Sequence, residues 1–110
     1  MLSEQLTIDE LLVSEEFRKR PGMYIGGNGI SALYFFIAGI HQAIFNYRLD
    51  EEFNRDIWLK HSFREWIVNH FDRGSTTAGW MHIILEENAG NEQVALRNFF
   101  ELYDKFRSEI

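Results

Sequence analysis

A run of small residues, Gly26-Gly27-Asn28-Gly29, lies directly before a strongly apolar stretch that begins at Ile30. Glycine-rich turns at the start of a helix can hold a phosphate group on backbone N–H groups that lack partners within the helix. The dinucleotide-binding pattern also needs a preceding strand, and the P-loop needs Gly-Lys followed by Ser or Thr. Neither context is found here, so we interpret the run as a structural turn.

Metal binding and catalysis are the next chemistries to consider. The chain has four histidines, which are His41, His61, His70 and His82. No two of them are four residues apart, and there is no His-Glu-x-x-His sequence, so the usual spacing of ligands on a helix is missing. With no cysteine and no Ser-His-Asp order, the sequence predicts no catalytic residues, no metal site and no cofactor. We therefore expect that the chain is not an enzyme.

The segment Arg18–Gly26 has the sequence RKRPGMYIG, and it resembles the opening of the DNA gyrase B-subunit ATPase domain. In that family the next helix carries a catalytic Glu and, four residues later, a magnesium-binding Asn. Aligning Gly29-Ile30 on the family's Gly-Leu puts Phe36 and Ile40 at these two positions. Neither side chain can activate water or hold a metal ion. The resemblance therefore implies a shared helix-stop-loop element without ATPase activity.

Arg64 and His70 are separated by five residues, and this spacing resembles the motif of the α-helical HEPN ribonucleases. The resemblance implies a dimer that cleaves RNA with its paired Arg64 and His70. Glu65 departs from the family, which usually has a neutral polar residue or His there. The apolar spacing also predicts that His70 shares a buried face with Phe63 and Ile67, whereas a catalytic histidine must be exposed. The ribonuclease is our alternative function.

Capping residues mark the first helix that must position these segments. Thr7 and Glu10 form a capping box, in which each side chain accepts a hydrogen bond from the other's backbone N–H. The helix is expected to reach about Lys19, with a break near Ser14, because Pro21 disfavours a helical conformation for the residue before it. The glycines that follow are expected to form a tight loop.

Apolar residues spaced three and four apart predict a long helix from Ile30 to about Tyr47, which we expect to be central. Three more helices are expected, beginning at Ser62, near residues 75–77 and at Asn91. No segment alternates long enough to predict a strand. The sequence therefore predicts an all-α fold over residues 1–110, a compact single domain of about five helices joined by short loops.

Composition and charge restrict the classes of partner. Hydrophobic residues make up 45% of the chain, enough to exclude a disordered protein. The net charge of −6 disfavours non-specific binding to nucleic acid and favours a basic partner. The apolar run 30–44 is too short for a membrane span and includes His41 and Gln42. We expect a cytoplasmic protein that binds neither nucleic acid nor membrane.

Several short motifs together resemble small bacterial immunity proteins of contact-dependent growth inhibition and related polymorphic toxin systems. They are the capped first helix, the loop with sequence RPGMYIG, the apolar helix, Gly79-Trp80 and the ending Phe99–Phe106. The resemblance covers most of the chain. It implies a protein that binds and neutralises one cognate toxin domain, often a nuclease, without catalytic residues of its own.

An acidic surface could inhibit a nuclease because its carboxylates would take the place of substrate phosphates in a basic groove. Two segments supply acidic candidates for toxin binding, and two aromatic residues beside the first are candidate anchors. These residues are Asp50, Glu51, Glu52, Asp56, Glu86, Glu87, Tyr47 and Trp58. The sequence predicts that they form an exposed surface which occludes the toxin's active site.

Overall fold

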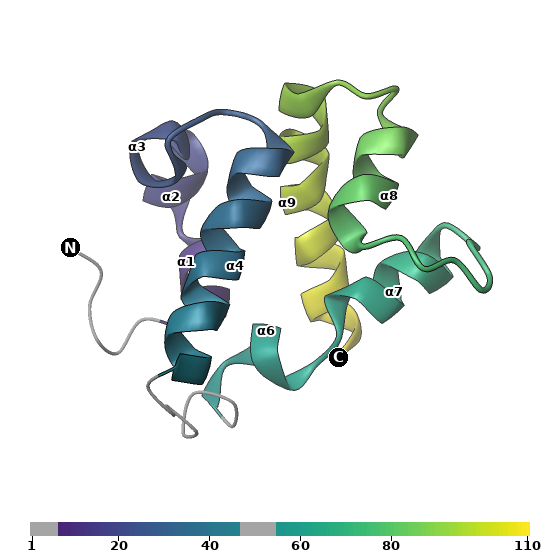
Figure 1. Cartoon of the computed structure of the whole chain (residues 1–110), viewed down its shortest axis with the longest axis horizontal. Helices are drawn as coiled ribbons and strands as arrows, with labels where there is room; N and C mark the ends of the chain where they lie inside the picture. Colours follow the sequence, from purple (N-terminus) through teal and green to yellow (C-terminus); the bar gives the residue numbers. More distant parts are fainter. Residues whose placement is uncertain (1–6, 47–54) are drawn as a thin grey trace.

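The structure is a computed structural model that describes residues 7–46 and 55–110. These residues form eight helices and no strand (Figure 1). The helices are α1 (Ile8–Val13), α2 (Glu15–Lys19), α3 (Gly22–Ile25), α4 (Ile30–Asn46), α6 (Ile57–Lys60), α7 (Phe63–His70), α8 (Trp80–Glu87) and α9 (Glu92–Glu109). The all-α prediction is confirmed. The expected number of about five is not matched, because several helices have only one or two turns.

The capping box at the start of α1 forms as predicted. The Glu10 N–H donates to the Thr7 hydroxyl at 3.0 Å, and the Thr7 N–H donates to the Glu10 carboxylate at 2.9 Å. Ser14 ends α1 and caps α2, so the expected break is confirmed. After Pro21 the chain forms the short helix α3 where we expected only a loop. Proline suits this place because its fixed φ matches the first turn of a helix.

Other helix starts agree with the sequence in two places and differ in one. The side chains of Ser62 and Asn91 cap α7 and α9, with hydrogen bonds of 3.1 and 3.0 Å from the N–H three residues ahead. We expected hydroxyl residues 75–77 to cap the helix between them. Instead α8 begins at Trp80 without a side-chain cap, and the Thr76 hydroxyl accepts a hydrogen bond within the connection.

The central helix is α9, so the expectation that the long apolar helix α4 is central was wrong. Figure 1 shows α9 between α4 and α8, and α9 packs on α1, α4, α7 and α8. It buries seven residues, which are Ala95, Leu96, Phe99, Phe100, Leu102, Tyr103 and Phe106. By contrast, α4 buries Ile30, Leu33, Ile37 and Ile44 on one face and leaves the opposite face in solvent. Some apolar side chains of α4, such as Phe35 and Phe45, therefore lie outside the core.

Aromatic rings fill the centre of the core where α6, α7, α8 and α9 meet. The Phe99 ring lies 5.1 Å from the Trp80 ring and 5.4 Å from the Phe63 ring, measured between centroids. Tyr103 lies 5.7 Å from Phe63 in an edge-to-face arrangement. Such pairs add to the stabilisation from buried area. Among the helices of the described segments, none has the length and apolar character needed to cross a membrane.

Candidate functional site

Asp56 is fully buried, at 0% exposure, and is therefore not part of an acidic surface as the sequence predicted. Its carboxylate accepts hydrogen bonds from the backbone N–H of Ile8 at 2.6 Å and of Asp9 at 3.0 Å, both in the first turn of α1. It also accepts one from the N–H of Trp58 at 3.0 Å and so caps α6. Burial raises the pKa of Asp56, and these hydrogen bonds oppose that rise. Asp56 joins two helices.

Trp58 is also a core residue, with 7% exposure, and not the exposed surface residue that we predicted. Its ring packs between Phe63 and Trp80, with centroid distances of 5.5 and 5.6 Å. The indole N–H donates to Nε2 of His41 at 2.8 Å. Removal of water from that side of the imidazole lowers the pKa of His41, and the Asp56 carboxylate opposes this effect. Because an indole N–H can only donate, Nε2 of His41 is the acceptor of this hydrogen bond.

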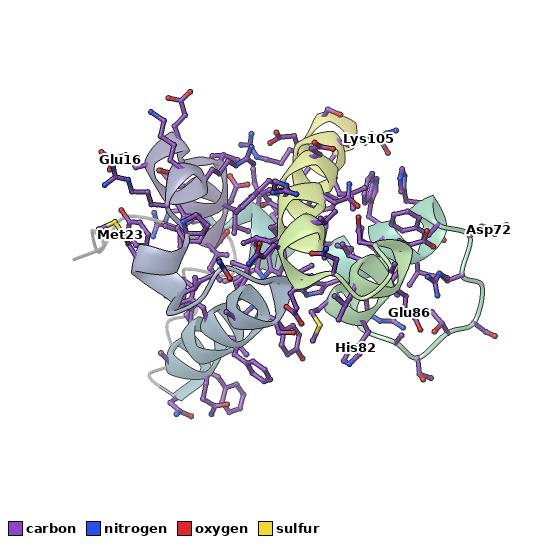
Figure 2. All side chains as sticks on the ribbon, turned by 90° about the horizontal axis from the view of Figure 1, so that it is seen from above. Glu16, Met23, Asp72, His82, Glu86 and Lys105 are labelled. Carbon is purple, nitrogen blue, oxygen red and sulfur yellow. The ribbon has the colours of Figure 1, made fainter. Side chains whose placement is uncertain are left out.

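Glu86 and Glu87 are exposed at the end of α8, as predicted, but both are ion-paired with Arg73. The guanidinium donates to Glu86 at 2.8 Å and to Glu87 at 2.9 Å. Figure 2 shows that Glu86 faces the side of the molecule that carries the connection between α7 and α8. Because the arginine offsets one of the two negative charges, this cluster is a weak mimic of phosphate. The remaining candidates, Tyr47, Asp50, Glu51 and Glu52, lie outside the described residues.

Arg64 and His70 have different surroundings at the two ends of α7. The Arg64 guanidinium donates to the carbonyl oxygens of Thr76 at 2.7 Å and Ala78 at 3.1 Å. These hydrogen bonds hold the segment between α7 and α8 against α7. His70 is exposed and stacks on Trp66 with 4.8 Å between ring centroids, so our expectation of a buried His70 was wrong. Within the described residues no hydrogen bond joins the two side chains. The arrangement therefore does not bring Arg64 and His70 together in one site, as the ribonuclease alternative would need.

The start of α4 shows why the glycine run precedes it. Glu92, at the start of α9, accepts hydrogen bonds from the backbone N–H of Ser31 at 2.9 Å and from its hydroxyl at 2.6 Å. A Cβ atom on Gly29 would lie only 2.6 Å from the Glu92 carboxylate and 2.8 Å from its Cβ. The chain's own carboxylate thus lies where a phosphate would bind, and Gly29 gives it room. Sequence reasoning missed Glu92 because 61 positions separate it from Ser31.

We expect Glu92 to make the fold less stable in acid. Hydrogen bonds from the side chain and backbone of Ser31 lower the pKa of Glu92 below 4.5 in the folded protein. A lowered pKa gives stability that is present above pH 4.5 and is lost as the pH falls through the folded-state pKa. Glu92→Gln should lower the free energy of unfolding at pH 7 by about 1 kcal/mol and reduce its decline below pH 4.5.

Urea denaturation followed by circular dichroism across this pH range measures the effect. The matched control is Glu101→Gln, since Glu101 is exposed on α9. An acid decline that is equal in the Glu92 variant and the wild type would show that the contact with Ser31 does not stabilise the fold.

An open groove of about 770 Å³ runs beside α4, between that helix and the segment that joins α6 to α7. Its floor is apolar and includes Ile37, Trp58, Phe63 and Trp80. Its polar lining includes His41, Lys60, His61 and Arg64, and Phe45 lies at its edge. None of the described residues that line the groove is Asp or Glu. The structure brings these residues together from separate helices, and the sequence did not predict the groove.

The fold and this site define the chain as a small all-α protein with an open, aromatic-floored groove. No protein-family model matches the chain, and neither the curated proteins nor the solved structures contain a match to it. Within residues 7–46 and 55–110, no group of three or more His, Cys, Asp or Glu side chains could hold a metal ion. Function is therefore inferred from the residues of the chain itself.

Proposed function

We propose that this chain is an immunity protein, which binds a toxin domain and inhibits it by covering part of its surface without a reaction of its own. The observation that carries this proposal is the solvent face of α4. Phe35 and Phe45 lie on it with 68% and 74% exposure. Ala38 and Gln42 complete a stripe at spacings of three, four and three residues, so all four side chains lie on one face of the helix. Of these four residues, Ala38, Gln42 and Phe45 also line the groove, so the face and the groove adjoin.

Exposed aromatic residues are informative when they form one surface. Single apolar residues on a protein surface are ordinary, whereas a contiguous patch is typical of a site that binds another protein. Aromatic side chains are enriched at the centres of such interfaces, where they supply much of the binding energy. The stripe on α4 adjoins the aromatic-floored groove, so together they offer a continuous docking surface. This supports a binding protein more directly than it supports an enzyme.

Charge supports a basic toxin as the partner. A net charge of −6 would speed association with a basic nuclease domain through long-range attraction. Of the acidic candidates, Asp56 is buried and the pair Glu86 and Glu87 is offset by Arg73. Occlusion of an active site by acidic side chains therefore depends on Asp50, Glu51 and Glu52, which follow α4 in the sequence.

The test is protection of bacterial cells that produce the toxin domain encoded beside this chain. The wild type should protect, and a variant with both Phe35→Ser and Phe45→Ser should lose protection. Its complex with the toxin should be weaker by about 2 kcal/mol or more if these rings are central contacts. The melting temperature should hardly change because both rings are in solvent. The matched control is Met23→Ser, since Met23 is 75% exposed on α3.

Two results would contradict the proposal. The first is absence of any complex between the wild-type chain and the toxin. The second is degradation of RNA by the chain alone that Arg64→Ala or His70→Ala abolishes, which would establish the ribonuclease alternative. Protection by the Phe35/Phe45 variant equal to that by the wild type would place the interface away from α4.

A further inference from the structure

The groove beside α4 is lined by basic side chains and by no described acidic one, although the chain as a whole is acidic. Lys60 and Arg64 contribute basic side chains to its lining, and His61 contributes an imidazole. No described lining residue is acidic, although the chain carries 17 Asp and Glu against 11 Lys and Arg. A local excess of positive charge in an acidic protein favours a ligand that carries negative charge.

The cationic groups of the groove are not neutralised within the part of the chain that the structure describes. Lys60 and His61 are exposed, and no ion pair or hydrogen bond to another described residue holds either side chain. The Arg64 guanidinium bonds to two carbonyl oxygens, which fix its position but leave its positive charge without a carboxylate. The groove lining therefore includes one arginine whose guanidinium is held by carbonyl oxygens and one exposed lysine without an acidic partner among the described residues.

The apolar floor of the groove indicates that a negatively charged ligand must also carry an apolar group. Trp58, Phe63 and Trp80 form an aromatic surface, and a volume of about 770 Å³ can accept several side chains. A small anion with an apolar group would cover this floor and leave the rest of α4 exposed. Phe35 lies outside the groove lining but on the same solvent face of α4 as Phe45. A polypeptide laid along α4 would cover both rings, so the surface as a whole favours a polypeptide.

We propose that the groove binds an acidic segment of a partner protein that carries at least one apolar side chain. The apolar side chain lies on the floor formed by Trp58 and Trp80, and the carboxylates of the segment pair with Lys60, His61 and Arg64. This proposal rests on the proposed function in one respect, since the partner is then the toxin domain. It also implies that the toxin meets the groove through a surface other than the basic one that holds its substrate.

A pair of synthetic peptides tests the proposal directly. In the first, glutamate alternates with leucine, and in the second each glutamate is replaced by lysine, with the same uncharged fluorophore on both. Fluorescence anisotropy with the full chain should show saturable binding of the acidic peptide only. That binding should weaken as sodium chloride is added, because salt screens the attraction. Equal affinity for the two peptides, or no binding of the acidic one, would overturn the proposal.

Charge reversal locates the binding to the groove. The double variant Lys60→Glu and His61→Glu should bind the acidic peptide about tenfold more weakly or worse. The control is Lys105→Glu, which reverses an exposed charge on α9 at a residue that does not line the groove. Thermal melting checks that both variants remain folded. If a variant does unfold, the salt dependence of peptide binding by the wild type still tests the role of charge. Equal weakening by the control would overturn the assignment to the groove.

The toxin domain then separates the two proposals. If the wild type binds the acidic peptide but forms no complex with the toxin, the groove inference stands and the immunity function fails. If the wild type neutralises the toxin while the Lys60/His61 variant does so equally well, the function stands and the groove inference fails. A concentration-dependent dimer of the wild type that the double variant dissociates would assign the groove to a second copy of the chain and overturn the proposal.

Discussion

Replacement of Asp56 by Ala is expected to lower the free energy of unfolding by about 3 kcal/mol or more. The substitution removes the acceptor of three backbone N–H groups, which belong to Ile8, Asp9 and Trp58. Each buried donor left without a partner costs about 1 to 3 kcal/mol. The loss should be cooperative, because the same carboxylate bonds to the first turn of α1 and caps α6, and α1 packs on α6 and α9. An alanine side chain leaves no group that could replace these bonds.

Urea denaturation at neutral pH measures this effect, with Glu101→Ala as the matched control. Glu101 is an exposed carboxylate on α9, and surface substitutions of this kind usually change stability by less than about 0.5 kcal/mol. Asp56→Asn should fall between the control and Asp56→Ala, since the amide keeps one acceptor oxygen. If Asp56→Ala unfolds like the wild type but no longer binds the proposed toxin partner, Asp56 is a binding residue on the surface. That result would refute its role as a buried acceptor of backbone hydrogen bonds.

Trp58→Ala is the second substitution for which we expect a large effect, about 3 to 5 kcal/mol of unfolding free energy. The Trp58 ring is nearly buried and contacts Phe63, Trp80 and Tyr103, with centroid distances of 5.5, 5.6 and 5.8 Å. Its removal leaves a cavity that rigid neighbouring rings cannot fill. Loss of toxin binding in this variant would therefore report unfolding, so it does not test whether Trp58 is an anchor.

The matched control for Trp58→Ala is Trp66→Ala. Trp66 is half-buried, and its indole N–H donates to Glu109 at 2.8 Å near the chain end, so a smaller loss is expected. Trp58→Phe keeps much of the packing but removes the donor to His41. Because that hydrogen bond favours the neutral imidazole, its loss should raise the pKa of His41, which NMR titration measures. An equal loss of stability in the two alanine variants would contradict the central position of Trp58.

The mechanism of toxin inhibition that we propose differs from the one that the sequence predicted. Sequence reasoning placed toxin recognition on an acidic surface made of Asp50, Glu51, Glu52, Asp56, Glu86 and Glu87. Asp56 is buried, and Glu86 and Glu87 are paired with Arg73, whereas the other three lie outside the described residues. The surface that offers exposed aromatic rings lies on α4 and adjoins a groove with cationic lining. A toxin bound at this surface would be inhibited sterically, because the bound chain would cover part of it. Carboxylates in the place of substrate phosphates would then not be required.

Helix boundaries in this chain follow from residues that are close together in sequence. Each of the side chains of Thr7, Ser14, Ser62 and Asn91 accepts a hydrogen bond from the N–H three residues ahead, in the helix that follows. The sequence predicted three of them as helix starts and a break near Ser14. Local hydrogen bonds of this kind need no distant partner, so residue type and spacing suffice to predict them. The all-α class followed from the same signals together with the absence of alternating segments.

The roles of the acidic residues depend on contacts between distant parts of the chain. Asp56 bonds to Ile8 across 48 positions, and Glu92 bonds to Ser31 across 61 positions. In the sequence both look like ordinary surface carboxylates, because nothing local shows which one will meet a free helix start. The position of α4 is similar: its apolar residues predict a central helix, yet α9 covers one face and leaves Phe35 and Phe45 in solvent. Which apolar face is buried depends on how all the helices pack, and that packing is a property of the whole chain.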